Sequence, residues 1–154
     1  MTIPFRHTAG FGKRIEYWII GQMLKEGLDV YVPLVDDFGV DAIIRKDDGT
    51  IFEAQIKARS NDVIMGDAAL FAAIPHEPRK NYYFIFYSER LNTTWIMSSK
   101  DFIKEAVQNK NGKNIGKRSI WFNGTKTDKE TKQKIEYPKP QFDKYIVKDF
   151  SIFR

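Results

Sequence analysis

Apolar side chains recur at helical spacing near the start of the chain, in the segment Phe11–Gly27. The stripe that they form consists of Ile15, Trp18, Ile19 and Met23. Because residues three, four and eight positions apart share one side of a helix, this segment is predicted to be a helix whose stripe faces the core. We expect Thr8 to act as its N-cap and Gly27 to lie just past its end, where helices favour glycine.

Farther along the chain, runs of β-forming residues are separated by turn residues. Strands are predicted at Leu28–Val35, Tyr82–Ser88, Thr93–Met97 and Ser119–Asn123. Helices are predicted at Asp67–Ile74, Lys100–Gln108 and Phe142–Phe153. Pro33 favours an edge position for the first of these strands, whereas the almost wholly apolar Tyr82–Ser88 is typical of a central buried strand. We expect Ser98 or Ser99 to cap the helix that begins at Lys100.

Two alternating runs flank the turn residues Asp47–Gly49 and predict a β-hairpin. A three-residue loop, in which Gly49 takes the left-handed conformation, sets Asp41 opposite Gln55. One face of the second strand then carries Glu53, Gln55, Lys57 and Arg59, and the other carries Phe52, Ala54, Ile56 and Ala58 together with Ala42 and Ile44 of the first strand. A two-residue loop would set Asp41 opposite Ile56 and mix polar with apolar residues on each face. We therefore favour the three-residue loop.

The composition fits one folded domain. Of the 154 residues, 42% are hydrophobic and 14% are aromatic, which supplies a core and argues against disorder. We predict a core over about residues 8–108 and, over about 109–154, a basic strand and loop extension with a C-terminal helix. The chain has no cysteine, no apolar run near the roughly 18 to 20 residues of a membrane span, and no apolar signal segment within Met1–Arg14. We therefore expect it in the cytoplasm.

Positive charge gathers in the last third of the chain. The net charge is +5, while the segment Lys104–Lys139 alone holds ten basic residues against four acids. Such a segment is typical of an arm that contacts phosphates with little sequence readout. It is equally typical of a solvated lysine-rich loop, and the sequence leaves both interpretations open. The surplus charge favours an anionic partner, and nucleic acid is the first candidate.

The polar face of the hairpin is the candidate for chemistry. It could be a solvated sheet surface, but Asp41 lies inside an otherwise apolar run, Val40–Ile44. A carboxylate, an amide carbonyl and an amine that meet across one strand pair suit a Mg²⁺ ion with a water molecule beside it. In such a site Lys57 can orient the attacking water and stabilise charge on a phosphate. The hairpin therefore predicts a metal site that acts on phosphate.

A glutamate on the first helix, then G-V-D at Gly39–Asp41, then a hairpin that ends in Q-I-K at Gln55–Lys57, resembles the PD-(D/E)xK nuclease superfamily. The pattern is most similar to the branch with glutamine in place of the middle acid, which includes Mrr-type restriction endonucleases and group I intron-associated homing endonucleases. The helix glutamate and G-V-D are also similar to archaeal Holliday-junction resolvases. The resemblance covers roughly Gly12–Arg59. It implies an α/β fold with a restriction-endonuclease-like αβββαβ core, a mixed sheet flanked by helices.

The resemblance also implies roles for single residues. The matched residues are Glu16 for the acid on the helix, Asp41 for the metal-binding aspartate, Gln55 for the second acid and Lys57 for the lysine. The implied ligands of a Mg²⁺ or Mn²⁺ cofactor are Asp41, Gln55, Glu16 and the carbonyl group of Ile56. Val40 stands where the family name has proline, which is a common change. Because Gln55 lacks the charge of an acid, Glu16 or Glu53 must compensate for it.

Together these features predict a metal-dependent endonuclease that hydrolyses phosphodiester bonds, in DNA in preference to RNA. The resemblance implies a homodimer, since cleavage of a duplex needs two sites. The residues expected to contact the nucleic acid are Lys13, Arg59, Lys113, Lys117 and Arg118.

Two other classes of protein fit the same sequence. One is a non-catalytic nucleic-acid-binding domain with a degraded nuclease site, and the other is a protein-binding subunit of a defence or toxin–immunity complex. Some chemistries are set aside. His7 and His76 have no metal-ligand spacing, so we expect surface or loop roles for both. The sequence also has no glycine-rich phosphate loop and no serine nucleophile motif.

Overall fold

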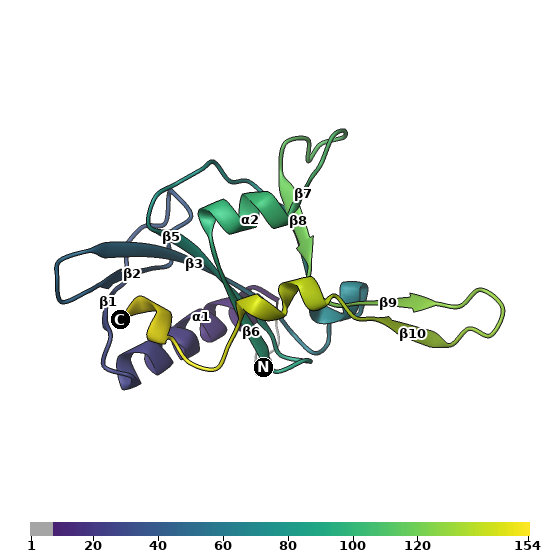
Figure 1. Ribbon diagram of the computed structural model, residues 1–154, viewed down its shortest axis with the longest axis horizontal. Helices are drawn as coiled ribbons and strands as arrows, with labels where there is room; N and C mark the ends of the chain where they lie inside the picture. Colours follow the sequence, from purple (N-terminus) through teal and green to yellow (C-terminus); the bar gives the residue numbers. More distant parts are fainter. Residues whose placement is uncertain (1–7) are drawn as a thin grey trace, which may run out of the picture.

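A six-stranded mixed sheet runs through the protein in the computed structural model, which describes residues 8–154 (Figure 1). In spatial order its strands are β1 (Asp29–Tyr31), β2 (Ala42–Arg45), β3 (Ile51–Arg59), β5 (Tyr82–Ser88), β6 (Thr93–Ser98) and β11 (Ile146–Val147). Strands β3 and β5 are parallel, and every other neighbouring pair in this sheet is antiparallel. The predicted central strand is therefore confirmed, and so is the mixed sheet.

Helix α1 (Thr8–Lys25) covers one face of this sheet (Figure 1). The buried residues of this layer include Phe11, Ile15, Ile19 and Met23 of the helix and Ala42, Ala54 and Ile56 of the sheet. The predicted stripe is right except at Trp18, which is 47% exposed and lies at the edge of the layer with its ring 5.2 Å from that of Tyr87. Gly27 follows the helix with a φ of 86°, as its position predicted. The predicted N-cap rests on the side chain of Thr8, which lies outside the described side chains.

The second face is covered by helix α2 (Ser99–Glu105) and by a smaller sheet. That sheet has the order β4 (Leu70–Ile74), β8 (Arg118–Trp121), β7 (Val107–Gln108). Its contact with the central sheet is rich in aromatic rings, namely Phe71, Tyr82, Phe84, Phe86, Trp95, Phe102 and Phe122. Ser98 caps α2 by accepting a hydrogen bond from the amide of Asp101, as predicted. The helix ends earlier than predicted because Val107 and Gln108 pair with β8.

Two predicted helices are wrong. The segment predicted at Asp67–Ile74 is a short 3-10 helix, η1 (Met65–Ala68), followed by β4, whose Phe71 pairs with Ile120 of β8. The segment predicted at Phe142–Phe153 consists of η2 (Pro140–Tyr145), β11 and η3 (Ser151–Phe153). In both segments strand pairing outweighed the helical spacing of the apolar residues. The apolar residues still dock as expected, since Phe142, Tyr145, Phe150 and Phe153 are buried.

The hairpin β2–β3 has the predicted register. Ala42 pairs with Ala54 and Ile43 pairs with Glu53. The loop is the predicted three-residue loop, because the amide of Lys46 bonds the carbonyl of Thr50 and Gly49 has a φ of 88°. The first strand is shorter than predicted: only Asp29–Tyr31 of Leu28–Val35 pair with β2, and the chain from Pro33 onward is a loop that leads to Asp41.

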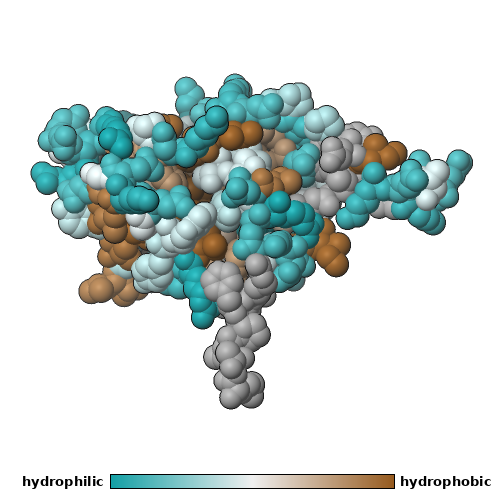
Figure 2. Space-filling view, turned by 90° about the horizontal axis from the view of Figure 1, so that it is seen from below, coloured by the Kyte–Doolittle hydropathy of each residue, from teal (hydrophilic) through white to brown (hydrophobic). Residues whose placement is uncertain are grey.

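A two-stranded ribbon projects from the body (Figures 1 and 2). It consists of β9 (Gly124–Thr127) and β10 (Lys134–Tyr137), which pair antiparallel. The turn between the two strands is exposed and hydrophilic over most of its length. Among the described helices, none is long and apolar enough to cross a membrane.

Candidate active site

Asp41 directly precedes β2, at the point where β3 extends beyond its pairing with that strand. Its amide donates to the carbonyl of Ala54 at 2.9 Å, and its carboxylate accepts from the amide of Ile56 at 2.7 Å. Asp41 thus contacts the backbone on both sides of Gln55, one step beyond the regular pairing that ends at Ala42. The amide of Ile56 has no backbone partner in β2, and the Asp41 carboxylate accepts its hydrogen bond in place of one.

The carbonyl group of Ile56 shares this open edge. Within a strand, the amide and the carbonyl of one residue point to the same side. The amide of Ile56 points to Asp41, so its carbonyl faces the side on which β2 has ended, away from β5. A backbone oxygen and a carboxylate therefore lie on the same side of β3, where β2 no longer pairs with it.

Negative charge surrounds Asp41. Burial raises the pKa of its carboxyl to about 7, from an ordinary value of 3.8. The hydrogen bond from Ile56 opposes this rise, while the charges of Glu16 and Asp36 add to it. Asp36 is fixed nearby because it accepts a hydrogen bond from the amide of Val40 at 2.8 Å. A cation bound at this point would offset both the cost of burying the charged carboxylate and its repulsion by Glu16 and Asp36.

Glu16 reaches the site from α1. Its side chain is 21% exposed and is paired with Lys13 at 3.2 Å. Its charge acts on the pKa of Asp41, so the fold brings the acid on the helix and the acid on the hairpin together. Helical spacing places Glu16 next to the buried stripe, since Ile15 and Ile19 both pack on the sheet.

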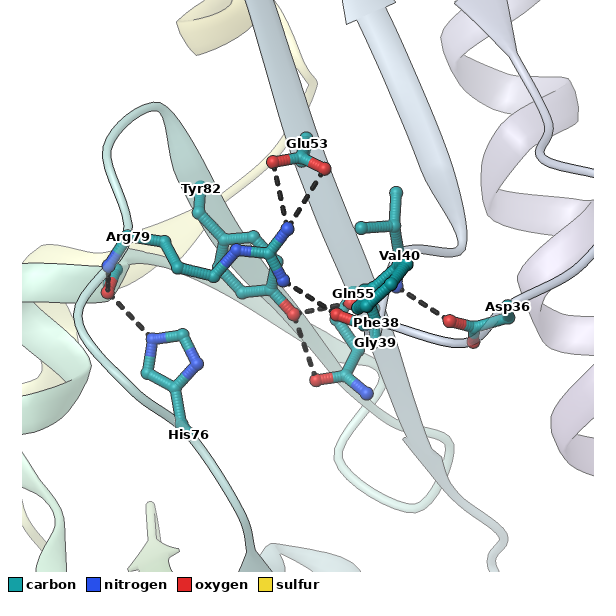
Figure 3. Close-up of polar contacts among 10 residues, drawn as sticks. Asp36, Phe38, Gly39, Val40, Glu53, Gln55, His76, Arg79 and Tyr82 are labelled. Atoms are coloured by element: carbon teal, nitrogen blue, oxygen red, sulfur yellow. Dashed lines mark hydrogen bonds and ion pairs between the residues drawn. The ribbon is translucent and has the colours of Figure 1, made fainter.

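Gln55 points to a tyrosine and a glycine (Figure 3). The hydroxyl of Tyr82 donates to the carbonyl of Gly39 in a very short hydrogen bond and lies 3.2 Å from Oε1 of Gln55. Gly39 has a φ of 69°, and a Cβ there would lie 3.3 Å from the tyrosine oxygen and 3.4 Å from Nε2 of Gln55. Glycine is required at this position by both its conformation and the close approach of these groups. Burial raises the pKa of the Tyr82 hydroxyl, which therefore keeps its proton.

Arg79 clamps the loop that carries Asp41. Its Nη1 donates to the carbonyl of Phe38 at 2.6 Å, and its Nη2 donates to both carboxylate oxygens of Glu53 at 3.0 Å (Figure 3). The guanidinium also lies over the ring of Tyr82, 4.5 Å from the ring centre. Glu53 is committed to this ion pair, so the charge that Gln55 lacks is not supplied by Glu53.

His76 packs against Tyr82. Its ring stacks on that of Tyr82 at 5.0 Å, and its Nε2 lies 2.7 Å from the hydroxyl of Ser99. Burial, together with the charges of Arg79 and Arg118, lowers the pKa of His76 to about 4, so the ring is neutral at pH 7. The loop role predicted for His76 is confirmed, and its half-buried ring packs among aromatic side chains. His7 lies outside the described residues.

Lys57 and Arg59 continue the polar face of β3 past Gln55. Both are half-buried and face the same side of the strand as Glu53 and Gln55. Burial lowers the pKa of Arg59, and its Nε is a buried donor for which the described part of the chain offers no hydrogen-bond partner. Two cationic side chains therefore follow the candidate ligands along one strand.

The other four residues expected to contact nucleic acid lie in two separate places. Lys13 is on α1 beside Glu16, and its side chain is 61% exposed. Lys113, Lys117 and Arg118 lie between β7 and β8 or at the start of β8, at the top of Figure 1. Arg118 is half-buried and donates to the carbonyl of Ile103, which ties β8 to α2. The structure brings the first of these four residues to the site and leaves the other three at a separate hairpin.

The donor atoms suit a hard divalent cation. The carboxylates of Glu16 and Asp41, the amide of Gln55 and the carbonyl of Ile56 are all oxygen donors of the kind that Mg²⁺ and Mn²⁺ take. Within residues 8–154, the described side chains contain no group of three acids or histidines that could hold a metal ion. A cation at this site would therefore depend on the amide and backbone oxygens as well as on the acids.

Sequence reasoning missed Asp36, Arg79 and Tyr82. Tyr82 was assigned to the core because it belongs to an apolar strand, and its ring is indeed buried. A usable signal in the sequence is its place at the first position of that strand. Arg79 carried no local signal, since its partners lie 26 and 41 residues away in the sequence.

Comparison with known proteins supports the fold. No family model and no curated protein matches the sequence. Among solved structures the chain is similar to a bacterial homing endonuclease, I-Ssp6803I, with a TM-score of 0.56 and 18% sequence identity over 91% of this chain and 88% of that one. The α/β fold is thus restriction-endonuclease-like, as the sequence predicted. At this identity the likeness concerns the fold alone.

Proposed function

We propose that the protein is a metal-dependent endonuclease that hydrolyses phosphodiester bonds in DNA. The observation that carries the proposal is the position of Asp41. Its half-buried carboxylate accepts from the amide of Ile56 and lies among like charges from Glu16 and Asp36. Such an arrangement is costly for folding alone and is typical of a cation site.

Each side chain has a role in this proposal. Asp41 and Glu16 bind the cation with their carboxylates, and Gln55 and Ile56 add neutral oxygen donors. Bound Mg²⁺ or Mn²⁺ supplies positive charge at the scissile phosphate. Lys57, one alternation past Gln55 on the same face, orients the attacking water and stabilises charge on the phosphate.

DNA is the proposed partner because cations line the path beside the site. Lys57 and Arg59 extend along β3 from the candidate ligands, and Lys13 lies on the helix that carries Glu16. The ribbon β9–β10 and the residues Lys113, Lys117 and Arg118 would contact phosphates farther along a duplex. Cleavage of both strands would need two such sites, so we propose a homodimer.

The test is cleavage of plasmid, branched and single-stranded DNA in Mg²⁺ and in Mn²⁺. We expect the wild-type chain to cut at least one substrate and Asp41→Ala to cut none. Asp37→Ala is the matched control, since it removes an exposed acid from the same loop. Wild type and Asp41→Ala equally inert in both metals would overturn the proposal.

A second candidate is a DNA-binding domain with a degraded site. It is favoured by the finding that the described residues hold no group of three acids or histidines suited to a metal. DNA binding that weakens with salt, without cleavage of any substrate, would support it. Absence of DNA binding would instead favour a protein-binding subunit.

A further inference from the structure

The hydroxyl of Tyr82 lies near two oxygen atoms but has one proton to donate. The carbonyl of Gly39 is the closer of the two, and a carbonyl can only accept. Oε1 of Gln55 is 3.2 Å away. With the proton directed to Gly39, the phenol oxygen presents only lone pairs to Gln55.

The amide of Gln55 can satisfy those lone pairs if it is turned over. The oxygen and nitrogen of a glutamine amide have nearly the same shape, and their assignment follows from the hydrogen bonds that they make. An oxygen facing the phenol would place two acceptors 3.2 Å apart with no proton between them. A nitrogen in the same place donates to the phenol, which then donates to Gly39 and accepts from Gln55.

We propose that Tyr82 is a positioning residue that holds Nε2 of Gln55 toward itself and thereby turns Oε1 of Gln55 toward the metal site. The second heavy atom of the amide points away from Tyr82 (Figure 3) and approaches Gly39, where a Cβ would lie only 3.4 Å from it. Gly39 is two residues before Asp41, so one hydroxyl links the loop of the aspartate to the orientation of the amide.

This arrangement gives a physical reason for glutamine in place of an acid. A glutamate at position 55 has two acceptor oxygens and cannot donate to Tyr82. An amide donates on one side and accepts on the other, which suits a residue placed between a phenol oxygen and a cation. The consequence for metal binding rests on the proposed function, whereas the orientation of the amide does not.

The orientation is measured by NMR on the metal-free protein. The side-chain amide signals of Gln55 are assigned by their loss in Gln55→Glu. We expect slowed exchange for one of its two protons in the wild type, and a change of shift and faster exchange in Tyr82→Phe, which removes only the hydroxyl. Tyr87→Phe is the matched control, because Tyr87 is on the same strand and donates to Asn92 on the other face.

Amide signals of Gln55 that are the same in the wild type and in Tyr82→Phe would overturn the inference. The thermal midpoints of both tyrosine variants, measured beside the spectra, report whether the fold is kept. If Tyr82→Phe unfolds, the exchange of the Gln55 amide protons in the wild type alone decides, since free protons contradict the proposed bond.

Mg²⁺ affinity, measured by calorimetry, tests the positioning role separately. Loss of a group that orients a ligand typically weakens metal binding by about 10- to 100-fold, and we expect this for Tyr82→Phe and no change for Tyr87→Phe. Unchanged affinity in Tyr82→Phe would overturn the positioning role. A wild-type protein in which the Gln55 amide is hydrogen-bonded to Tyr82 but which binds no Mg²⁺ would contradict the proposed function. It would still support the proposed orientation of the amide.

Discussion

The two ends of the stretch Glu53–Ile56 in strand β3 hold their acids in opposite ways. At one end Glu53 is neutralised by Arg79, which also binds the loop carbonyl of Phe38. At the other end no ion pair between described residues neutralises Asp41, which binds the amide of Ile56, and Glu16 and Asp36 make its ionisation harder. The contrast teaches that the balanced end holds the loop in place, whereas the unbalanced end is left for a ligand to complete.

The largest effect is expected from Asp41→Asn. The amide oxygen can still accept from Ile56, so the fold should be kept, while a charged donor of the site is lost. A metal centre supplies several kcal/mol to a phosphoryl reaction, so cleavage should fall by about a thousand-fold or more, roughly 4 kcal/mol. Steady-state rates in Mg²⁺ measure this. Asp37→Asn should cut at the wild-type rate, and a similar loss there would assign the effect to the loop as a whole.

A smaller effect is expected when the balanced end is broken. Arg79→Met leaves Glu53 without its partner and frees the carbonyl of Phe38. Because the pair is about one-third exposed, we expect a loss of about 1–2 kcal/mol in the free energy of unfolding, below the cost of breaking a fully buried pair. Urea denaturation measures this loss.

Two variants control for this prediction. Lys13→Met breaks the exposed pair with Glu16 and should cost less than about 0.5 kcal/mol. Adding Glu53→Gln to Arg79→Met should recover part of the loss, since no unpaired charge remains. A double variant whose loss equals the sum of the single losses would show that the pair is not coupled.

Next in size is the effect of a side chain at Gly39, between the two ends. Gly39→Ala places a Cβ at a φ of 69° and 3.3 Å from the tyrosine oxygen, and we expect a loss of about 1 kcal/mol together with reduced cleavage. Gly49→Ala has a φ of 88° but no atom within 4 Å of its Cβ. Gly49→Ala should lower the free energy of unfolding by a similar amount and leave cleavage unchanged. Equal losses of cleavage in the two variants would contradict the role given to Gly39.

The smallest effect concerns pH. The folded state raises the pKa of Asp41 from 3.8 to about 7, chiefly by burial, so it binds the proton more tightly than the unfolded chain does. The contribution of Asp41 to stability is therefore full below about pH 4 and is lost as the pH rises to about 7. Between pH 5 and pH 8, the urea midpoint of the metal-free wild type should fall more than that of metal-free Asp41→Asn. An equal fall in both would mean that Asp41 titrates normally.

The hairpin could be predicted because its causes are local. Gly49 sets the loop, and the alternation of polar and apolar residues along β3 sets the register. The resemblance and helical spacing then placed Glu16 toward the hairpin. Each of these inferences needed only neighbours in the sequence or a known pattern.

The clamp could not be predicted because its causes are distant. Arg79 and Tyr82 meet the hairpin only because β5 lies parallel to β3 after a long connection. The spacing of Phe71 and Ile74 in that connection predicts a helix, whereas both residues lie in a strand of the smaller sheet. Spacing does not record which strand is available as a partner.

The most direct measurement of the central claim is iron-mediated cleavage of the protein itself. Fe²⁺ takes the place of Mg²⁺, and ascorbate with peroxide then cuts the chain near the bound ion, at positions that mass spectrometry identifies. Cuts near Glu16, Asp41 and Gln55–Lys57, suppressed by Mg²⁺ and lost in Asp41→Asn, are the predicted result. Cuts confined to the chain around Arg79, or no localised cuts, would contradict the claim that the unbalanced end of the stretch Glu53–Ile56 is a metal centre.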